Sequence, residues 1–142
     1  MSSDPAVPEG GIRARPESFR ARALAASLTV RDLRQSLAWY RDVAGFSVER
    51  EYGPEGNARA IALRAGTVEI LVVQDDGARG LDRVKGEGLS LQFTTAQNID
   101  ELANQIKERG GALESEPADI FGARAFRLKD PDGFRLVFSS ER

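Results

Sequence analysis

The sequence contains no histidine and no cysteine among its 142 residues. Without imidazole or thiolate groups, the chain cannot build a Ser-His-Asp triad, a Cys-His dyad, a disulfide or a His-containing zinc or iron site. A metal site would need carboxylates, carbonyls and water alone. Any acid–base chemistry would fall to Asp, Glu, Lys or Tyr side chains.

The sequence also lacks long hydrophobic runs, a secretory signal and a dominant charge. No apolar run approaches the ~18 residues that a membrane span needs, and the N-terminus has no apolar signal core. The net charge is −2, without the basic stripe of a nucleic-acid binder. Hydrophobic residues make up 41% of the chain, which suits one globular domain. We expect a cytoplasmic protein that binds neither nucleic acid nor membranes.

The first half of the chain predicts one strand, one helix and three further strands. Residues 1–22 mix Pro, Gly, Ser and charge without periodicity, which indicates a flexible tail. Residues 23–30 alternate as a half-buried strand does. A helix over 33–44 is indicated by a capping Asp32 and by the stop signal Gly45. Three strands are then predicted at 46–52, 58–65 and 67–73. The buried face of the first strand would carry Leu24, Ala26, Leu28 and Val30.

The second half of the chain repeats this pattern. After a polar, Gly-rich linker at 75–87, alternation predicts a strand over 89–93, with Leu89, Leu91 and Phe93 on its helix-facing side. Asn98 caps a second helix, which the Gly110-Gly111 pair ends. A short strand at 112–116 precedes a hairpin whose turn is Asp130-Pro131-Asp132-Gly133.

The repeated unit predicts the fold class. Each unit, 23–74 and 88–142, has a helix that covers only one face of its strands, so the other face curves toward a second unit. We therefore expect an α+β protein with two βαβββ modules, which form a curved, cup-like mixed sheet with the helices on its outer face. A concave face of this kind is where small ligands bind.

Two segments resemble a known family. "LTVRDLRQSLAWYRDVAGF" at the first strand and helix and "FGARAFRLKDPDGFRLVF" at the last hairpin are similar to the vicinal oxygen chelate superfamily, which includes glyoxalases, bleomycin-resistance proteins and ring-cleaving dioxygenases. The resemblance extends over residues 23–140, both modules. It implies the same paired-module fold, and it implies a homodimer.

The resemblance also bears on metal binding. The metal-dependent members place one ligand on each of four strands, and these positions fall on Ala25, Glu69, Gly88 or Leu89, and Val137 of this sequence. Only Glu69 can ligate a metal, whereas a catalytic ion usually needs three protein ligands. The sequence therefore predicts no metal and no cofactor.

Two functions follow from the resemblance. The first is metal-independent binding or sequestration of a small organic molecule, with an antibiotic as one candidate. The alternative is an enzyme of the same superfamily, of lyase, isomerase or dioxygenase type, that uses Glu69 as a base or as a residual metal ligand.

The candidate ligand-binding residues are those that strand alternation and the resemblance place at the cup: Ser27, Glu69, Leu71, Ser90, Gln92, Phe121, Arg124 and Val137. Glu69 has a second interpretation, as a partly buried carboxylate paired with Arg135 or Arg124. Phe121 and Arg124 have another as well, as a loop anchored by one aromatic ring. The polar residues would otherwise lie on a solvated sheet face.

Overall fold

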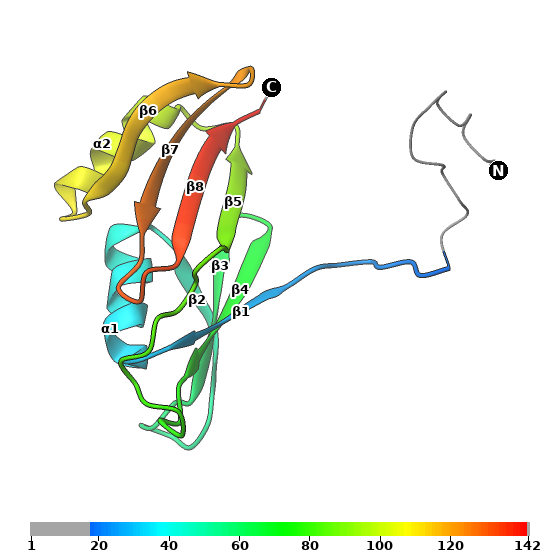
Figure 1. Cartoon of the computed structure of the whole chain (residues 1–142), viewed down its shortest axis with the longest axis vertical. Coiled ribbons are helices and arrows are strands. Elements are labelled where there is room, and N and C mark those ends of the chain that lie inside the picture. Colours follow the sequence, from blue (N-terminus) through cyan, green and yellow to red (C-terminus); the bar gives the residue numbers. More distant parts are fainter. Residues whose placement is uncertain (1–17, 142) are drawn as a thin grey trace.

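The structure, a computed structural model, describes residues 18–141. Most of the predicted tail, residues 1–22, lies outside the described residues. The elements are, in chain order, β1 (Ala26–Val30), α1 (Leu33–Ala38), η1 (Trp39–Val43), β2 (Ser47–Tyr52), β3 (Ala60–Ala65), β4 (Val68–Gln74), β5 (Ser90–Thr95), α2 (Ile99–Glu108), β6 (Leu113–Ile120), β7 (Ala123–Lys129) and β8 (Arg135–Ser140). The predicted double βαβββ order is confirmed (Figure 1).

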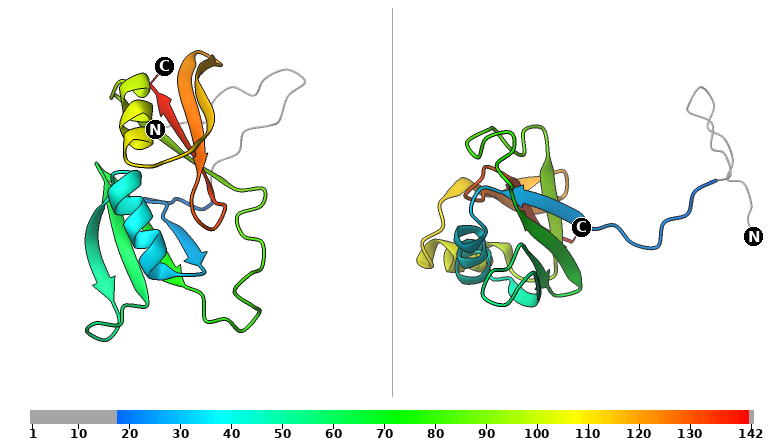
Figure 2. Two further views of the ribbon diagram at one scale, coloured as in Figure 1. Left: turned by 90° about the vertical axis from the view of Figure 1, so that its left-hand side faces the viewer. Right: turned by 90° about the horizontal axis from the view of Figure 1, so that it is seen from below.

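The strands form two separate sheets of four strands each. Sheet A has the order β1-β4-β3-β2 and sheet B the order β5-β8-β7-β6. In each sheet the first strand of the module pairs in parallel with the last, and the other pairs are antiparallel. Both helices lie on the same side of the molecule (Figures 1 and 2). The sheets are curved and mixed, as predicted, but no strand pairing joins them within residues 18–141.

Side-chain caps begin both helices where the sequence places them. The Asp32 carboxylate accepts the backbone N–H groups of Arg34 and Gln35, and the Asn98 side chain accepts that of Glu101. The first helix changes from α1 to the π-helical turn η1, where the Ala44 N–H reaches the Trp39 carbonyl. The hydrophobic spacing predicts a single regular helix, because it does not encode this wider turn.

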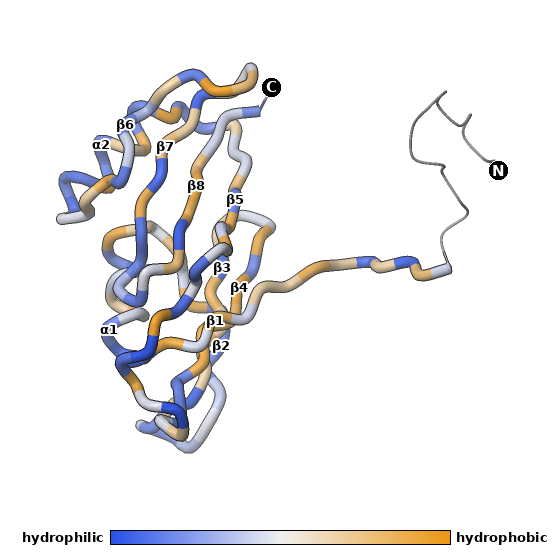
Figure 3. Tube along the Cα trace, viewed as in Figure 1, coloured by the Kyte–Doolittle hydropathy of each residue, from blue (hydrophilic) through white to orange (hydrophobic). Residues whose placement is uncertain are grey.

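A single core joins the two modules. Figure 3 shows apolar and polar stretches alternating along β7 and β8. Phe126 and Leu128 of β7 and Leu136 and Phe138 of β8 belong to this core. Fully buried members come from both modules, including Leu28 and Leu63 of sheet A and Leu128 and Leu136 of sheet B. Each such side chain contributes roughly 1.5–3 kcal/mol of burial free energy. The two modules therefore share one hydrophobic core.

Several strand boundaries differ from those predicted by alternation. Leu24 is 97% exposed, because β1 begins only at Ala26, which pairs with Ile70 near the start of β4. Leu89 is also exposed, since β5 begins one residue later. β6 extends to Ile120, well beyond the predicted end at 116, because it pairs with β7 as far as Ala123. Alternation alone does not show where a partner strand ends.

The linker between the modules is held by a buried carboxylate. Asp75 accepts the N–H of Gly77 and forms ion pairs with Lys85 and Arg83. The hydrogen bond from Lys85 is the main reason that the pKa of Asp75 lies well below its usual range.

No helix of the described residues is long and apolar enough to cross a membrane.

Candidate functional site

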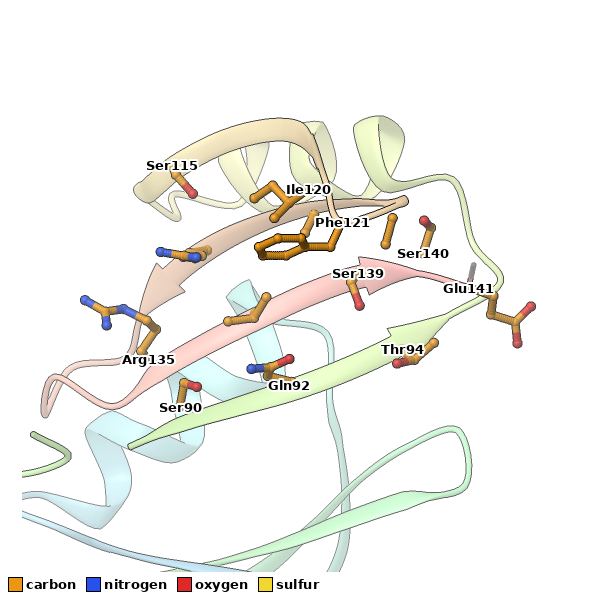
Figure 4. Close-up of a pocket in the computed structure, with 14 residues that line it drawn as sticks. Ser90, Gln92, Thr94, Ser115, Ile120, Phe121, Arg135, Ser139, Ser140 and Glu141 are labelled. Carbon is orange, nitrogen blue, oxygen red and sulfur yellow. The ribbon is translucent and has the colours of Figure 1, made fainter. Parts of the chain in front are cut away.

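The concave face of sheet B forms a cavity of about 660 Å³. Strand alternation brings Ser90 and Gln92 of β5, Arg127 of β7 and Val137 of β8 to this face. The register confirms that they are neighbours, because Val137 pairs with Gln92 on one side and with Arg127 on the other. The remaining lining residues include Thr94, Ser115, Ile120, Phe121, Ala123, Ala125, Arg135 and Ser139 (Figure 4).

The lining combines hydrogen-bonding groups, apolar surface and positive charge. Hydroxyl and amide groups of β5 and β8 form the floor, together with the apolar side chains of Val137 on β8 and Ala125 on β7. Arg135 is neutralised by Glu114, with N–O distances of 2.7 and 2.8 Å. Arg127 has no carboxylate within 4.0 Å in the described part of the chain. This mixture is typical of a site for an organic molecule with polar substituents.

Phe121 lies at the tip of the β6–β7 hairpin and is 88% exposed. Ile120 pairs with Ala123, so Phe121 and Gly122 form a two-residue loop with positive φ angles of 50° and 82°. A left-handed conformation costs a non-Gly residue roughly 1–2 kcal/mol. In Figure 4 the ring extends over the pocket face of sheet B, beside Ile120. A strained, exposed aromatic residue at a cavity rim indicates a contact surface.

The candidates of the first module lie elsewhere. Ser27 and Leu71 are register partners on sheet A, and Glu69 is two residues before Leu71 on the same face. The structure therefore brings these three together, as predicted, but none of them lines the sheet B cavity. The predicted cup is not closed within one chain, because the cavity is built by sheet B alone.

The partner of Glu69 is Arg64, not Arg135 or Arg124. The Arg64 guanidinium lies 3.2 Å from Glu69 and 2.8 Å from Glu49. The reason is the β3–β4 register, which places Arg64 directly opposite Glu69. Both side chains of the pair are close to half-exposed. The pair is a surface interaction, not a buried one.

Arg124, a predicted ligand-binding residue, does not line the sheet B cavity. Its neighbours Ala123 and Ala125 line the cavity, so alternation turns Arg124 to the opposite face. There it binds both oxygens of Asp100 on α2, at 2.7 and 3.0 Å, and Asp119 at 3.1 Å. The hydrogen bond with Asp100 is the largest cause of its raised pKa. Arg124 joins α2 to sheet B.

The residues present do not fit the divalent metal of the metal-dependent relatives. Ala25, Gly88 and Val137 offer no ligating side chain. Within residues 18–141, no three His, Cys, Asp or Glu side chains are grouped closely enough to hold a metal ion. The Glu69 carboxylate is occupied by Arg64.

Sequence reasoning missed Arg127 and Ser115. Both lie on the cavity face and are register partners on β7 and β6. The position of Arg127 could have been predicted from the strand alternation of "ARAFR", because Ala123, Ala125 and Arg127 lie two residues apart and therefore on the same face of β7. Ser115 had no comparable signal, since it lies between two irregularities in the β6–β7 register.

Comparison with known proteins identifies the family. The model described as Glyoxalase/Bleomycin resistance protein/Dioxygenase superfamily matches residues 22–138. The chain belongs to this superfamily. No curated protein sequence matched the chain.

Several solved structures share the fold of this chain. A superfamily member from Sphaerobacter thermophilus is 24% identical, with a TM-score of 0.66 over 86% of this chain and 98% of that chain. TioX from a Micromonospora species is 17% identical, with a TM-score of 0.70 over 86% of this chain and 100% of that chain. A virulence protein from Salmonella typhimurium is 22% identical, with a TM-score of 0.66 over 87% and 99%. These likenesses establish the fold, not the activity.

Proposed function

We propose that this superfamily member binds or sequesters a small organic ligand without a metal ion, in the cytoplasm. The observation that carries the proposal is the sheet B cavity, where Gln92 and Ser90 offer hydrogen bonds beside the exposed ring of Phe121. A planar molecule with polar substituents, such as an aromatic antibiotic, fits this chemistry: its ring would contact Phe121 and its substituents the floor.

The enzymatic alternative has less support from the structure. A base needs to reach the proton that it removes. The Glu69 carboxylate lies 3.2 Å from the Arg64 guanidinium, and this ion pair competes with proton abstraction wherever the substrate binds. The described carboxylates do not gather into a metal site either. Ligand binding therefore needs fewer additional assumptions than catalysis.

We further propose that the binding site is completed in a homodimer. The sheet B cavity is open on one side, and the corresponding face of sheet A carries the other candidates, Ser27, Glu69 and Leu71. A two-fold axis can place sheet A of one copy opposite sheet B of the other, which creates two equal sites. In this arrangement the predicted ligand-binding residues of sheet A and those of sheet B would face the same site.

A ligand panel with two variants tests the proposal. Purified protein is screened in EDTA against planar antibiotics and aromatic metabolites, with the shift in melting temperature as the measurement. A ligand that raises the melting temperature should lose roughly 10-fold or more in affinity with Phe121→Ala or Gln92→Ala, because each removes a direct contact. Asn104→Ala, an exposed polar change on α2, is the matched control and should leave affinity unchanged.

Three results would contradict the proposal. The first is no stabilisation by any member of a broad panel. The second is a ligand whose binding disappears in EDTA and returns with a divalent metal. The third is equal binding by Phe121→Ala, Gln92→Ala and the Asn104→Ala control.

A further inference from the structure

A second cavity, of about 500 Å³, lies between the two modules on the other face of β5. The sheet B cavity contacts Ser90 and Gln92 of this strand, the second cavity contacts Phe93 and Thr95, and Thr94 borders both. Its walls come from the end of η1, the β3–β4 turn, the segment after β5 and helix α2. The lining residues are Ala44, Gly45, Phe46, Ala65, Gly66, Thr67, Val68, Phe93, Thr94, Thr95, Ala96, Gln97, Leu102, Gln105, Arg109 and Phe138.

One side of this cavity is aromatic. Phe93 meets Phe46 and Phe138 edge-on, with ring centroids 5.7 and 5.6 Å apart. Leu102 of α2 and Val68 at the start of β4 add aliphatic surface. A bound ring can continue this edge-to-face arrangement, which favours an aromatic group over a polar one.

The charge of the cavity comes from one residue. Of the lining residues within 18–141, Arg109 alone carries a charge, and none is an Asp or Glu. In the described part of the chain, no carboxylate lies within the 4.0 Å of an ion pair with Arg109. The polar groups around it, Gln97, Gln105 and Thr95, are neutral. The cavity therefore carries one uncompensated positive charge.

The guanidinium of Arg109 has donors to spare. It donates to the Val43 carbonyl at 3.3 Å and to the Gln105 side chain at 3.5 Å, both near the long limit for a hydrogen bond. A guanidinium has five N–H donors, so others remain for a ligand. Gly45 makes room for this group, because a Cβ at that position would lie 3.2 Å from the Arg109 Nη1 atom.

We propose that this second cavity binds a small aromatic carboxylate. The carboxylate pairs with the guanidinium of Arg109 in the bidentate manner that such pairs favour, and the ring packs against Phe93. A single cationic group beside neutral amides matches a monoanion better than a dianion, which would retain an uncompensated buried charge. This site is separate from the sheet B cavity and does not depend on the function proposed for it.

The test compares 2-naphthoate with its uncharged isostere 2-naphthamide by ¹H–¹⁵N NMR titration of the full-length protein. Naphthoate should shift the backbone signals of Gly45, Gly66, Gln97 and Arg109, and should bind roughly 10-fold or more tightly than naphthamide. Arg109→Gln should remove this difference, and Arg109→Lys should retain part of it because the charge remains. Arg79→Gln, which removes an exposed cation that lines neither cavity, is the matched control and should leave the affinity for naphthoate unchanged.

A second variant guards against a loss of folding in Arg109→Gln. Ala96 is exposed and lines the cavity, so Ala96→Trp fills the space but leaves Arg109 in place. This variant should keep the native spectrum and lose naphthoate binding. Equal binding of naphthoate and naphthamide, shifts centred on Gln92 and Val137, or undiminished binding by Ala96→Trp would each overturn the proposal.

Discussion

At the scale of single residues, one buried hydrogen bond holds the first helix to the last hairpin. The Tyr40 hydroxyl donates to Asp130 Oδ2 at 2.7 Å, and Asp130 Oδ1 accepts the N–H groups of Asp132 and Phe134. Burial raises the pKa of Asp130, and the bond from Tyr40 acts in the opposite direction because it favours the ionised form. The hydroxyl of Tyr40 therefore offsets part of the free-energy cost of burying the ionised Asp130 carboxylate.

We predict that Tyr40→Phe lowers the free energy of unfolding by roughly 1.5–3 kcal/mol at neutral pH, because the Asp130 carboxylate loses a donor that water cannot replace. Urea unfolding measures the loss. Tyr52→Phe is the matched control, since Tyr52 is exposed. An equal decrease in the free energy of unfolding in both variants would show that the Tyr40–Asp130 hydrogen bond does not stabilise the fold.

A second residue-scale prediction concerns strain at Phe121. Asn adopts a positive φ with less cost than Phe, and the 88% exposed ring contributes little to packing. Phe121→Asn should therefore keep or raise the free energy of unfolding, by up to about 1 kcal/mol, and should weaken binding of any ligand found for the sheet B cavity. Thermal unfolding and a ligand titration on the same sample separate the two effects. A clear loss of stability would show that the ring has a structural role.

At the scale of elements, Glu114 joins the two strands that flank β7. Its carboxylate on β6 binds Arg135 on β8 at 2.7 and 2.8 Å and lies 3.6 Å from Lys129 on β7. The hydrogen bond from Arg135 is the main reason that the pKa of Glu114 falls from 4.5 to about 2. The ion pair holds the guanidinium of Arg135, which lines the sheet B cavity.

The lowered pKa fixes the direction of a pH effect. Because the pKa of Glu114 is lower in the folded state, its contribution to stability is present above pH 4.5 and is lost as the pH falls toward about 2. Glu114→Gln should therefore reduce the dependence of stability on pH in this window. Denaturation at a series of pH values measures the slope. Glu108→Gln, at the exposed end of α2, provides the control, and an equal slope in both variants would contradict the assignment.

At the scale of the whole molecule, we predict that the ligand site is shared between two chains, with sheet A of one copy facing sheet B of the other. A dimer of twice the 15.5 kDa chain mass should be seen by light scattering. Leu71→Arg should disable the sheet A half and Phe121→Ala the sheet B half, so that each variant alone binds poorly. In a mixed dimer one site would receive both defects and the other neither. Mixing the two variants should therefore restore binding to part of the sites.

The restored binding is the decisive observation, because a site within one chain cannot be repaired by mixing. No recovery after subunit exchange, with exchange verified by mass spectrometry, would place each site in a single chain. A monomer at all concentrations would exclude the shared site directly.

The order of the elements and the faces of their side chains follow from local patterns in the sequence. Periodicity of two and of 3.6 residues, with caps at Asp32 and Asn98, is a local property, and the register of the strands confirmed which face Gln92 and Glu69 occupy. The repeat then identified the paired-module fold. The absence of His and Cys was likewise visible in the sequence alone.

Only the tertiary structure decided which residues meet. Strand alternation predicts that the side chains of Arg124 and Ala125 lie on opposite faces of β7. It does not predict that Arg124 forms an ion pair with Asp100 on α2. The pairing of Glu69 with Arg64 depends on the β3–β4 register. The two modules share a core, but their strands form separate sheets. Ser27 and Gln92, which the sequence assigns to one cup, therefore lie on different sheets. Periodicity records the direction in which a side chain points, whereas its neighbour is fixed by packing between segments far apart in the chain.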